Sequence, residues 1–203
     1  MPRPKSLTEA EIATAALAVL DRDGLEALSM RTIAAELGLS TMGLYRYVTD
    51  REQLEGLVVD LVLSAADPEP PARGTWQRRL TVLVERLRTA VSAHPAVVPL
   101  LLTNRHTSMR LARWGESVLA VLTDAGFTDR PRVIAFRALV GYVTGALQVE
   151  HLGPLSGPGT KALAELPRTE YPHITENARL AQRITPDEEF RGGLSILLRG
   201  LAP

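Results

Sequence analysis

Residues 29–48 read SMRTIAAELGLSTMGLYRYV, and this stretch decides how the chain around it folds. Its first half is a short amphipathic segment in which Ile33, Ala34 and Leu37 have the spacing of one apolar helix face. Gly38 then permits a chain reversal, because glycine adopts left-handed backbone angles without strain. A second short segment follows Ser40. Two short helices around a glycine-containing turn are typical of a helix-turn-helix motif.

The second segment, residues 41–48, has the composition of an exposed helix rather than of a core helix. Leu44 and Val48 alone fall on an inward face, and the polar, small and aromatic side chains lie outside it. Phenol hydroxyls bond phosphates, and small residues at a helix start allow close approach to base edges. The composition therefore favours a helix that lies in a groove of DNA. The alternative is a packing helix with buried tyrosine rings.

Helix caps around this stretch define the neighbouring helices. Thr8 followed by Glu11 predicts a capping box, and Gly24 predicts the end of that first helix. The second helix is expected to end at Gly38, the third to span residues 41–48 and the fourth to run to about residue 66. The expected caps of these three helices are Ser29, Ser40 and Asp50.

The segment 67–74 contains three prolines within four residues, which cannot continue a helix. We place a domain boundary here, with a helix-turn-helix domain at residues 1–50, a connecting helix at 51–66 and a second domain at 67–203. Further helical segments are predicted near residues 75–93, 96–103, 107–124, 131–153, 160–166, 175–182 and 186–201. No segment shows sustained period-two alternation, so the predicted fold class is all-α.

The composition bounds the chemistry of the chain. Apolar residues make up 45% and aromatic residues 4%, which favours helices with cores of Leu, Val and Ala. The absence of cysteine excludes disulfides, thiolate metal sites and cysteine nucleophiles, and it is compatible with the cytoplasm. The N-terminus does not have the pattern of a signal peptide. Residues 133–149 contain Arg137 and Gln148, so this apolar stretch predicts a buried or interface helix rather than a membrane span.

Charge argues against DNA binding through bulk attraction. Residues 1–66 contain six basic and ten acidic residues. If this part binds DNA, its basic side chains must therefore gather on one face. Arg3 and Lys5 either follow the phosphate backbone as an arm or form a solvated tail.

The sequence contains no recognisable catalytic or metal-binding pattern. It has no nucleophile with a base at a characteristic spacing, no phosphate loop and no paired-carboxylate motif. His94, His106, His151 and Glu150 have spacings that match no metal motif. We therefore expect neither an enzyme, nor a cofactor, nor a metal site.

Residues 7–54 resemble the N-terminal domain of the TetR family of repressors. The matching strings are DGLEALSMR at 23–31, IAAELGLS at 33–40, LYRYV at 44–48 and DREQL at 50–54. The resemblance implies that the two tyrosines and the basic residue after Asp50 contact phosphates, while the starts of the second and third helices reach bases or backbone. The DNA-binding residues that it implies are Arg31, Thr41, Met42, Gly43, Tyr45, Tyr47 and Arg51.

The C-terminal part resembles the tetracycline repressor subgroup of that family. The matches are WQ at 76–77, LRTA at 87–90, TNR at 103–105 and AGF at 125–127. Leu101 stands where that subgroup has a histidine that coordinates the drug's magnesium, and Leu83 and Leu87 replace polar drug contacts. The resemblance therefore implies a small, largely apolar effector other than magnesium–tetracycline. Candidate contacts are Leu83, Leu87, Leu101, Asn104, Arg105, Trp114, Ser117 and Glu150, with His106 as a further polar candidate.

The resemblance also implies a homodimer, with residues 131–153 and 186–201 forming a four-helix interface. One recognition helix covers few base pairs, so specific affinity needs two half-sites of a palindromic operator, about 34–36 Å apart. Gly141 and Gly145 permit close helix packing, either at the dimer interface or at a core crossing. We expect a cytoplasmic repressor of double-stranded DNA that a small molecule releases, with no membrane partner. The alternative is an activator or a ligand-binding module without repressor activity.

Overall fold

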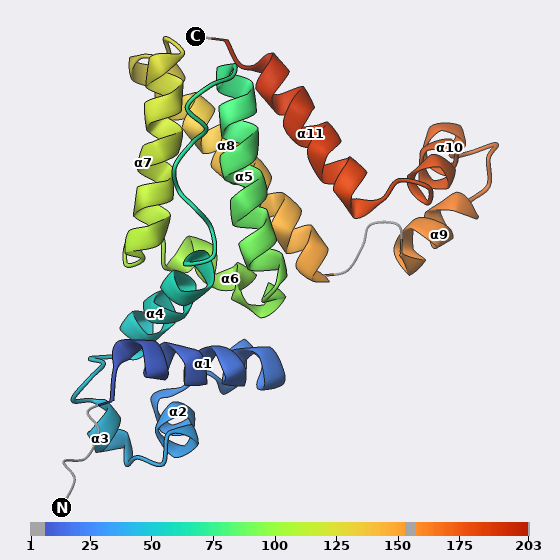
Figure 1. Ribbon diagram of the computed structural model, residues 1–203. Coiled ribbons are helices and arrows are strands. Elements are labelled where there is room, and N and C mark those ends of the chain that lie inside the picture. Colours follow the sequence, from blue (N-terminus) through green and yellow to red (C-terminus); the bar gives the residue numbers. More distant parts are fainter. Residues whose placement is uncertain (1–6, 153–156, 203) are drawn as a thin grey trace, which may run out of the picture. The chain divides into compact units, whose positions relative to one another are not determined.

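The computed structural model describes residues 7–152 and 157–202, and these residues are entirely helical or irregular (Figure 1). Eleven α-helices and two short 3₁₀ helices make up their secondary structure, which confirms the predicted all-α class. By internal contacts the chain divides into two compact units, residues 1–124 and 125–203. Both sides of the proline-rich segment 67–74 thus belong to one compact unit. The functional boundary placed at that segment remains a prediction.

The first unit begins with the helices of the helix-turn-helix region. These are α1 (Glu9–Asp23), the 3₁₀ helix η1 (Leu25–Ala27), α2 (Met30–Glu36) and α3 (Thr41–Leu44). The side chains of Thr8, Ser29 and Ser40 accept backbone N–H groups as the predicted caps. Helix α3 is shorter than the helix predicted over residues 41–48. Regular α-helix ends at Leu44, because the next residues form turns in which the Tyr47 N–H bonds the Leu44 carbonyl, three residues back, at 2.9 Å.

The connecting helix α4 (Arg51–Leu63) is the central element of the first unit. It starts at the predicted cap Asp50 and ends a few residues before the predicted residue 66. It packs against α1 and also contacts α5 (Trp76–Ser92), α6 (Val98–Thr103) and α7 (Met109–Asp124), with the 3₁₀ helix η2 (Pro95–Val97) leading into α6. Figure 1 shows α5 and α7 running side by side.

The proline-rich segment after α4 is fastened to α5. The Arg86 guanidinium donates to the Glu69 carbonyl at 2.6 Å and lies 2.8 Å from the Asp67 carboxylate. An arginine that bonds both backbone and carboxylate fixes the course of a segment that has no helix of its own. The predicted helix break is therefore confirmed, but the segment is held in place.

The second unit contains α8 (Asp129–Leu152), α9 (Pro158–Ala164), α10 (Pro172–Ala181) and α11 (Pro186–Gly200). Tyr142 of α8 donates to the Phe190 carbonyl of α11 at 2.6 Å, and their rings lie 5.8 Å apart. α9 and α10 pack against each other. Helix α10 begins at Pro172, three residues before the predicted segment 175–182.

Helix α8 is long and apolar enough to cross a membrane by length and composition alone, and 22% of its apolar stretch is buried. Core helices of soluble proteins and signal sequences share this length and composition, so one such helix is weak evidence for a membrane span. A Cβ added to Gly141 or to Gly145 would meet no described heavy atom within 4 Å. The two glycines are therefore open in this chain and do not mark a core crossing among the described residues.

Candidate DNA interface and effector pocket

The turn between α2 and α3 sets the orientation of the recognition segment, which we define as residues 41–47. Gly38 has φ +67°, a backbone angle that other residues rarely adopt, and the next N–H bonds the Ala34 carbonyl at 2.8 Å. Ile33, Ala34, Leu44 and Val48 are buried as predicted. The inward face thus holds the segment on the motif, and its other side chains point away from the core.

The recognition segment presents its side chains to solvent. Met42 is 75% exposed and Tyr45 is 46% exposed, which contradicts the alternative of a buried tyrosine pair for Tyr45. Tyr47 is half-buried, and the Arg46 guanidinium lies over its ring at 5.9 Å from the centroid. Thr41 and Gly43, at the start of α3, are half-buried. None of these six residues is buried in the core.

The two arginines predicted to reach DNA differ in their surroundings. Arg31 of α2 is exposed, and its side chain makes no hydrogen bond or ion pair with another described residue. Arg51, the first residue of α4, is held: its Nε lies 2.7 Å from Glu55 Oε1 and its Nη2 lies 3.3 Å from the Leu25 carbonyl oxygen. Arg31 lies in the helix-turn-helix region and Arg51 begins the connecting helix that follows it, whereas Arg3 and Lys5 lie outside the described residues.

Most acidic side chains of the first 66 residues bond donors of the chain itself. Glu36 lies 3.0 Å from an Arg22 nitrogen, Asp21 lies 2.7 Å from His94, and Asp50 caps α4. The carboxylates with such partners are Glu11, Asp21, Asp23, Glu36, Asp50, Glu52, Glu55 and Asp60. Asp23, Glu36 and Glu55 face arginines, whereas caps such as Glu11 and Asp50 bond neutral N–H groups and keep their charge, so DNA binding still requires basic side chains gathered on one face.

A pocket of about 610 Å³ lies in the first unit, where α4, α5 and α7 meet. Leu87 and Trp114, two of the predicted effector contacts, line it, together with Leu63. The Trp114 Nε1–H donates to the Leu83 carbonyl at 3.1 Å, so the indole has its polar atom satisfied by backbone. The indole therefore contributes apolar surface to the pocket.

The other predicted effector contacts are not among the residues that line this pocket. Leu83 and Leu101 are buried, Ser117 and Glu150 are half-buried, and Arg105 is exposed and donates to the Leu102 carbonyl at 3.4 Å. Asn104 is fully buried, with its amide bonded to neighbouring side chains. Whether these side chains touch an effector remains a prediction.

Sequence reasoning missed several side chains at the rim of this pocket. Asp60, Met109, Arg110 and Arg113 line it beside the apolar residues, and Met109 is 75% exposed. Asp60 also accepts the Arg110 backbone N–H at 3.2 Å, which helps to cap α7. Asp60 and the start of α7 are almost 50 residues apart in the chain, and no local pattern connects them.

An exposed recognition segment on a helix-turn-helix defines a DNA-binding transcriptional regulator. Residues 12–54 match the family model of bacterial regulatory proteins of the tetR family, and residues 67–203 match that of the tetracyclin repressor-like C-terminal domain. The chain therefore belongs to the TetR family of transcriptional regulators and is not an enzyme. Both parts of the resemblance drawn from the sequence are confirmed.

Individual relatives agree with this assignment. The HTH-type transcriptional repressor DrrR1 of Streptomyces coeruleorubidus is 34% identical over 146 residues, 71% of this chain and only 54% of that protein. The structure of ActR from Streptomyces coelicolor in complex with actinorhodin has a TM-score of 0.84 and 27% identity, and the match covers 98% of this chain and 96% of ActR. The structure of BioQ with its natural double-stranded DNA operator has a TM-score of 0.71 and 25% identity, and the match covers 97% of this chain and 99% of BioQ.

Proposed function

We propose that this regulator is a cytoplasmic repressor that binds a palindromic operator as a homodimer and is released by a small, largely apolar effector. The observation that carries the proposal is the exposed recognition segment, whose Met42 and Tyr45 project from a motif with a buried inner face. Relatives support it: BioQ is solved on an operator, ActR is solved with actinorhodin, and DrrR1 is named a repressor.

Each predicted DNA residue has a role that its position supports. The hydroxyls of Tyr45 and Tyr47 and the guanidinium of Arg51 bond phosphates, which fixes the register on the duplex. Met42 supplies apolar surface for a thymine methyl in the major groove, because its apolar side chain is 75% exposed. The residues that lie close to base edges or backbone are Arg31, Thr41 and Gly43.

The homodimer is supported by an unpartnered face of the second unit. Val133 and Ile134 of α8 are 45% and 64% exposed, and Ile196 of α11 is 65% exposed. Isolated exposed apolar side chains are ordinary, but here they lie on the two helices that the family resemblance assigns to the interface. The open Gly141 and Gly145 allow another helix to approach α8 closely.

The effector class follows from the pocket beside Trp114. Leu63, Leu87 and the apolar indole surface form one wall, while Asp60 and Arg113 lie in the lining with their charges. An effector with an apolar body and a few polar groups matches such a lining. Release from DNA requires that it bind the conformer of low DNA affinity more tightly, with a coupling of about 1–3 kcal/mol.

The proposal is tested with duplexes that the purified chain selects from a random-sequence library. Nuclease protection should show two half-sites related by a dyad, and sedimentation should show a dimer that Ile134→Glu with Ile196→Glu converts to a monomer. A small apolar compound that raises the thermal stability of the chain should also weaken its DNA binding. If the chain selects no preferred duplex from the library, the proposal that it represses an operator is contradicted. If DNA binding persists with the compound bound, the chain is instead an activator or a ligand-binding module.

A further inference from the structure

The last residue of α6 together with the connection to α7, residues 103–108, is called the α6–α7 loop here, and it is bonded to α4 at three carboxylates. Asn104 Nδ2 lies 3.3 Å from Glu55 Oε2, His106 Nε2 lies 2.8 Å from Glu52 Oε1, and Ser108 Oγ lies 2.5 Å from Asp60 Oδ1. Between them α4 approaches the loop closely at Gly56, where a Cβ would lie 3.3 Å from Thr107 Oγ1. Loop and helix are therefore held together along most of α4.

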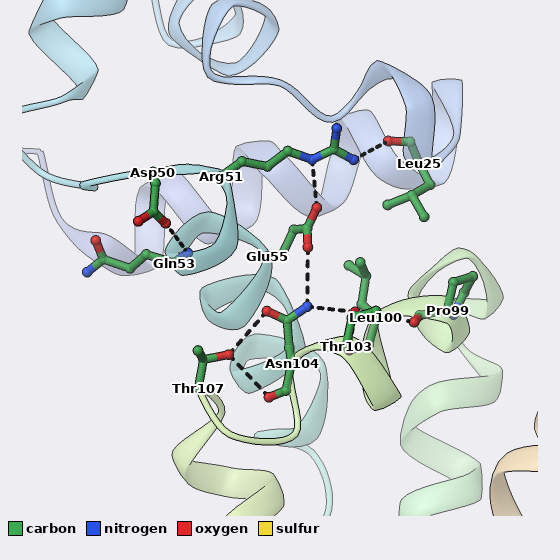
Figure 2. Close-up of polar contacts among 10 residues, drawn as sticks. All are labelled: Leu25, Asp50, Arg51, Gln53, Glu55, Pro99, Leu100, Thr103, Asn104 and Thr107. Carbon is green, nitrogen blue, oxygen red and sulfur yellow. Dashed lines mark hydrogen bonds and ion pairs between the residues drawn. The ribbon is translucent and has the colours of Figure 1, made fainter.

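Glu55 is the point at which these contacts reach the DNA-binding residues. Its two carboxylate oxygens have different partners: Oε2 accepts from Asn104, and Oε1 accepts from Arg51 Nε at 2.7 Å (Figure 2). The Glu55 side chain is 14% exposed, so its charge is largely shielded from water. One carboxylate thus joins the loop to the first residue of α4.

The contact with Glu55 orders the Arg51 side chain but leaves some of its N–H donors available. Its Nε bonds Glu55 and its Nη2 bonds the Leu25 carbonyl of η1, while the side chain remains 49% exposed. A guanidinium has five N–H donors, so about three of them stay available for a phosphate. A side chain that is already ordered loses less conformational entropy when it binds a phosphate.

Asn104 has a fixed orientation at the other end. The residue is fully buried, its Oδ1 accepts from Thr107 Oγ1 at 3.1 Å, and its Nδ2 also donates to Thr103 Oγ1 at 3.1 Å. Because an ionised carboxylate can only accept hydrogen bonds, the amide nitrogen must face Glu55, and the amide oxygen then accepts from the Thr107 hydroxyl. The loop therefore determines the orientation of the Glu55 carboxylate.

We propose that Glu55 is a positioning residue: Asn104 fixes its carboxylate, the carboxylate orders Arg51 for a DNA phosphate, and movement of the loop away from α4 weakens DNA binding through this chain of contacts. The inference rests on the proposed phosphate contact of Arg51. Loss of the Asn104 bond frees Glu55, and Arg51 then regains rotamer freedom that DNA binding must remove again.

A double-mutant cycle tests the coupling on a duplex selected by the unmodified, full-length chain. Asn104→Ala should weaken binding about 3–10-fold when Arg51 is present and should change it by less than about two-fold in the Arg51→Ala background. The matched control is His106→Ala, which removes a loop contact that does not lead to Arg51 and should have the same effect in both backgrounds. Circular dichroism confirms that each variant is folded at the temperature used.

A reversed pair provides the rescue. Asn104→Asp places a carboxylate against Glu55 and should weaken binding, whereas adding Glu55→Gln restores one donor and one acceptor and should recover most of the affinity. Equal effects of Asn104→Ala in both backgrounds, or no recovery by the reversed pair, would overturn the positioning role alone. An Arg51→Ala variant with unchanged affinity and salt dependence would overturn the phosphate contact and the inference together.

Discussion

The recognition segment, residues 41–47, and the α6–α7 loop, residues 103–108, are similar in length but use their side chains in opposite ways. Met42 and Tyr45 point outward without a side-chain hydrogen bond to another described residue. Asn104 and Ser108 are buried, and their polar atoms bond α4 carboxylates. Side chains left without internal partners are available to an external one, whereas satisfied buried groups hold helices in register.

The largest effect is expected at the recognition segment. Replacing Tyr45 and Tyr47 together by Ala removes the two proposed phosphate contacts from each protomer of the proposed dimer. It should weaken operator binding by at least about 1,000-fold, since bonds to charged groups contribute about 1.5–3 kcal/mol each. Fluorescence titration with a selected duplex measures the loss. Thermal unfolding should remain cooperative, with a midpoint close to that of the unmodified chain. Loss of cooperative unfolding would instead mean that the two tyrosine rings are part of the core.

A comparison of two helix caps sharpens the contrast. Ser40 caps α3 by accepting the Gly43 N–H, and Ser108 accepts the Leu111 N–H and also donates to Asp60. Ser108→Ala should therefore lower the free energy of unfolding by about 2–4 kcal/mol, and Ser40→Ala by about 1 kcal/mol. Denaturant titration of both variants gives the difference. Equal decreases in the free energy of unfolding for the two variants would mean that the hydrogen bond from Ser108 to Asp60 does not contribute to stability.

Arg51 lies between the two patterns, because it is bonded internally and still half-exposed. Arg51→Ala should reduce the slope of log affinity against log salt by about one unit for each phosphate contact that is lost. The readout is a series of titrations at increasing potassium chloride. A slope unchanged from the unmodified chain would remove Arg51 from the phosphate contacts.

The smallest effect is expected at an exposed carboxylate that is bonded much like those on α4. The Thr185 backbone N–H and then its hydroxyl lower the pKa of Glu188 in the capping box of α11. A lowered folded-state pKa contributes stability above the unfolded pKa, and this contribution is lost as pH falls through the folded value. Nuclear magnetic resonance titration should place Glu188 below its ordinary pKa. Thr185→Ala should raise the pKa of Glu188 part of the way toward its ordinary value. An unchanged pKa in this variant would mean that the Thr185 hydroxyl does not contribute to the shift.

The sequence predicted the features whose cause is local. Caps at Thr8, Ser29, Ser40 and Asp50 follow from residue type and spacing, and the inward face of the motif follows from helical periodicity. The early end of regular helix at Leu44 was missed, because apolar spacing continues to Val48 while the backbone tightens into turns.

Contacts between distant segments could not be predicted in the same way. The sequence predicts Asn104 as a polar effector contact, which is untested, and gives no indication of its bond to Glu55, 49 residues earlier. Arg51 was assigned to phosphate from resemblance alone, with no indication that a neighbouring carboxylate orders it. Periodicity describes which face of a helix is apolar, but it does not identify the side chain that meets a given carboxylate.

The contacts between α4 and the loop have a consequence for building chimeras. Asn104 and Ser108 lie beyond the proline-rich segment, and the carboxylates that they bond, Glu55 and Asp60, lie before it. Joining the N-terminal part of this chain to the effector part of a relative at residues 67–74 would separate side chains that bond each other in this structure. A hybrid sensor should therefore take α4 from the same parent as its effector part, with the junction between the recognition segment and Asp50.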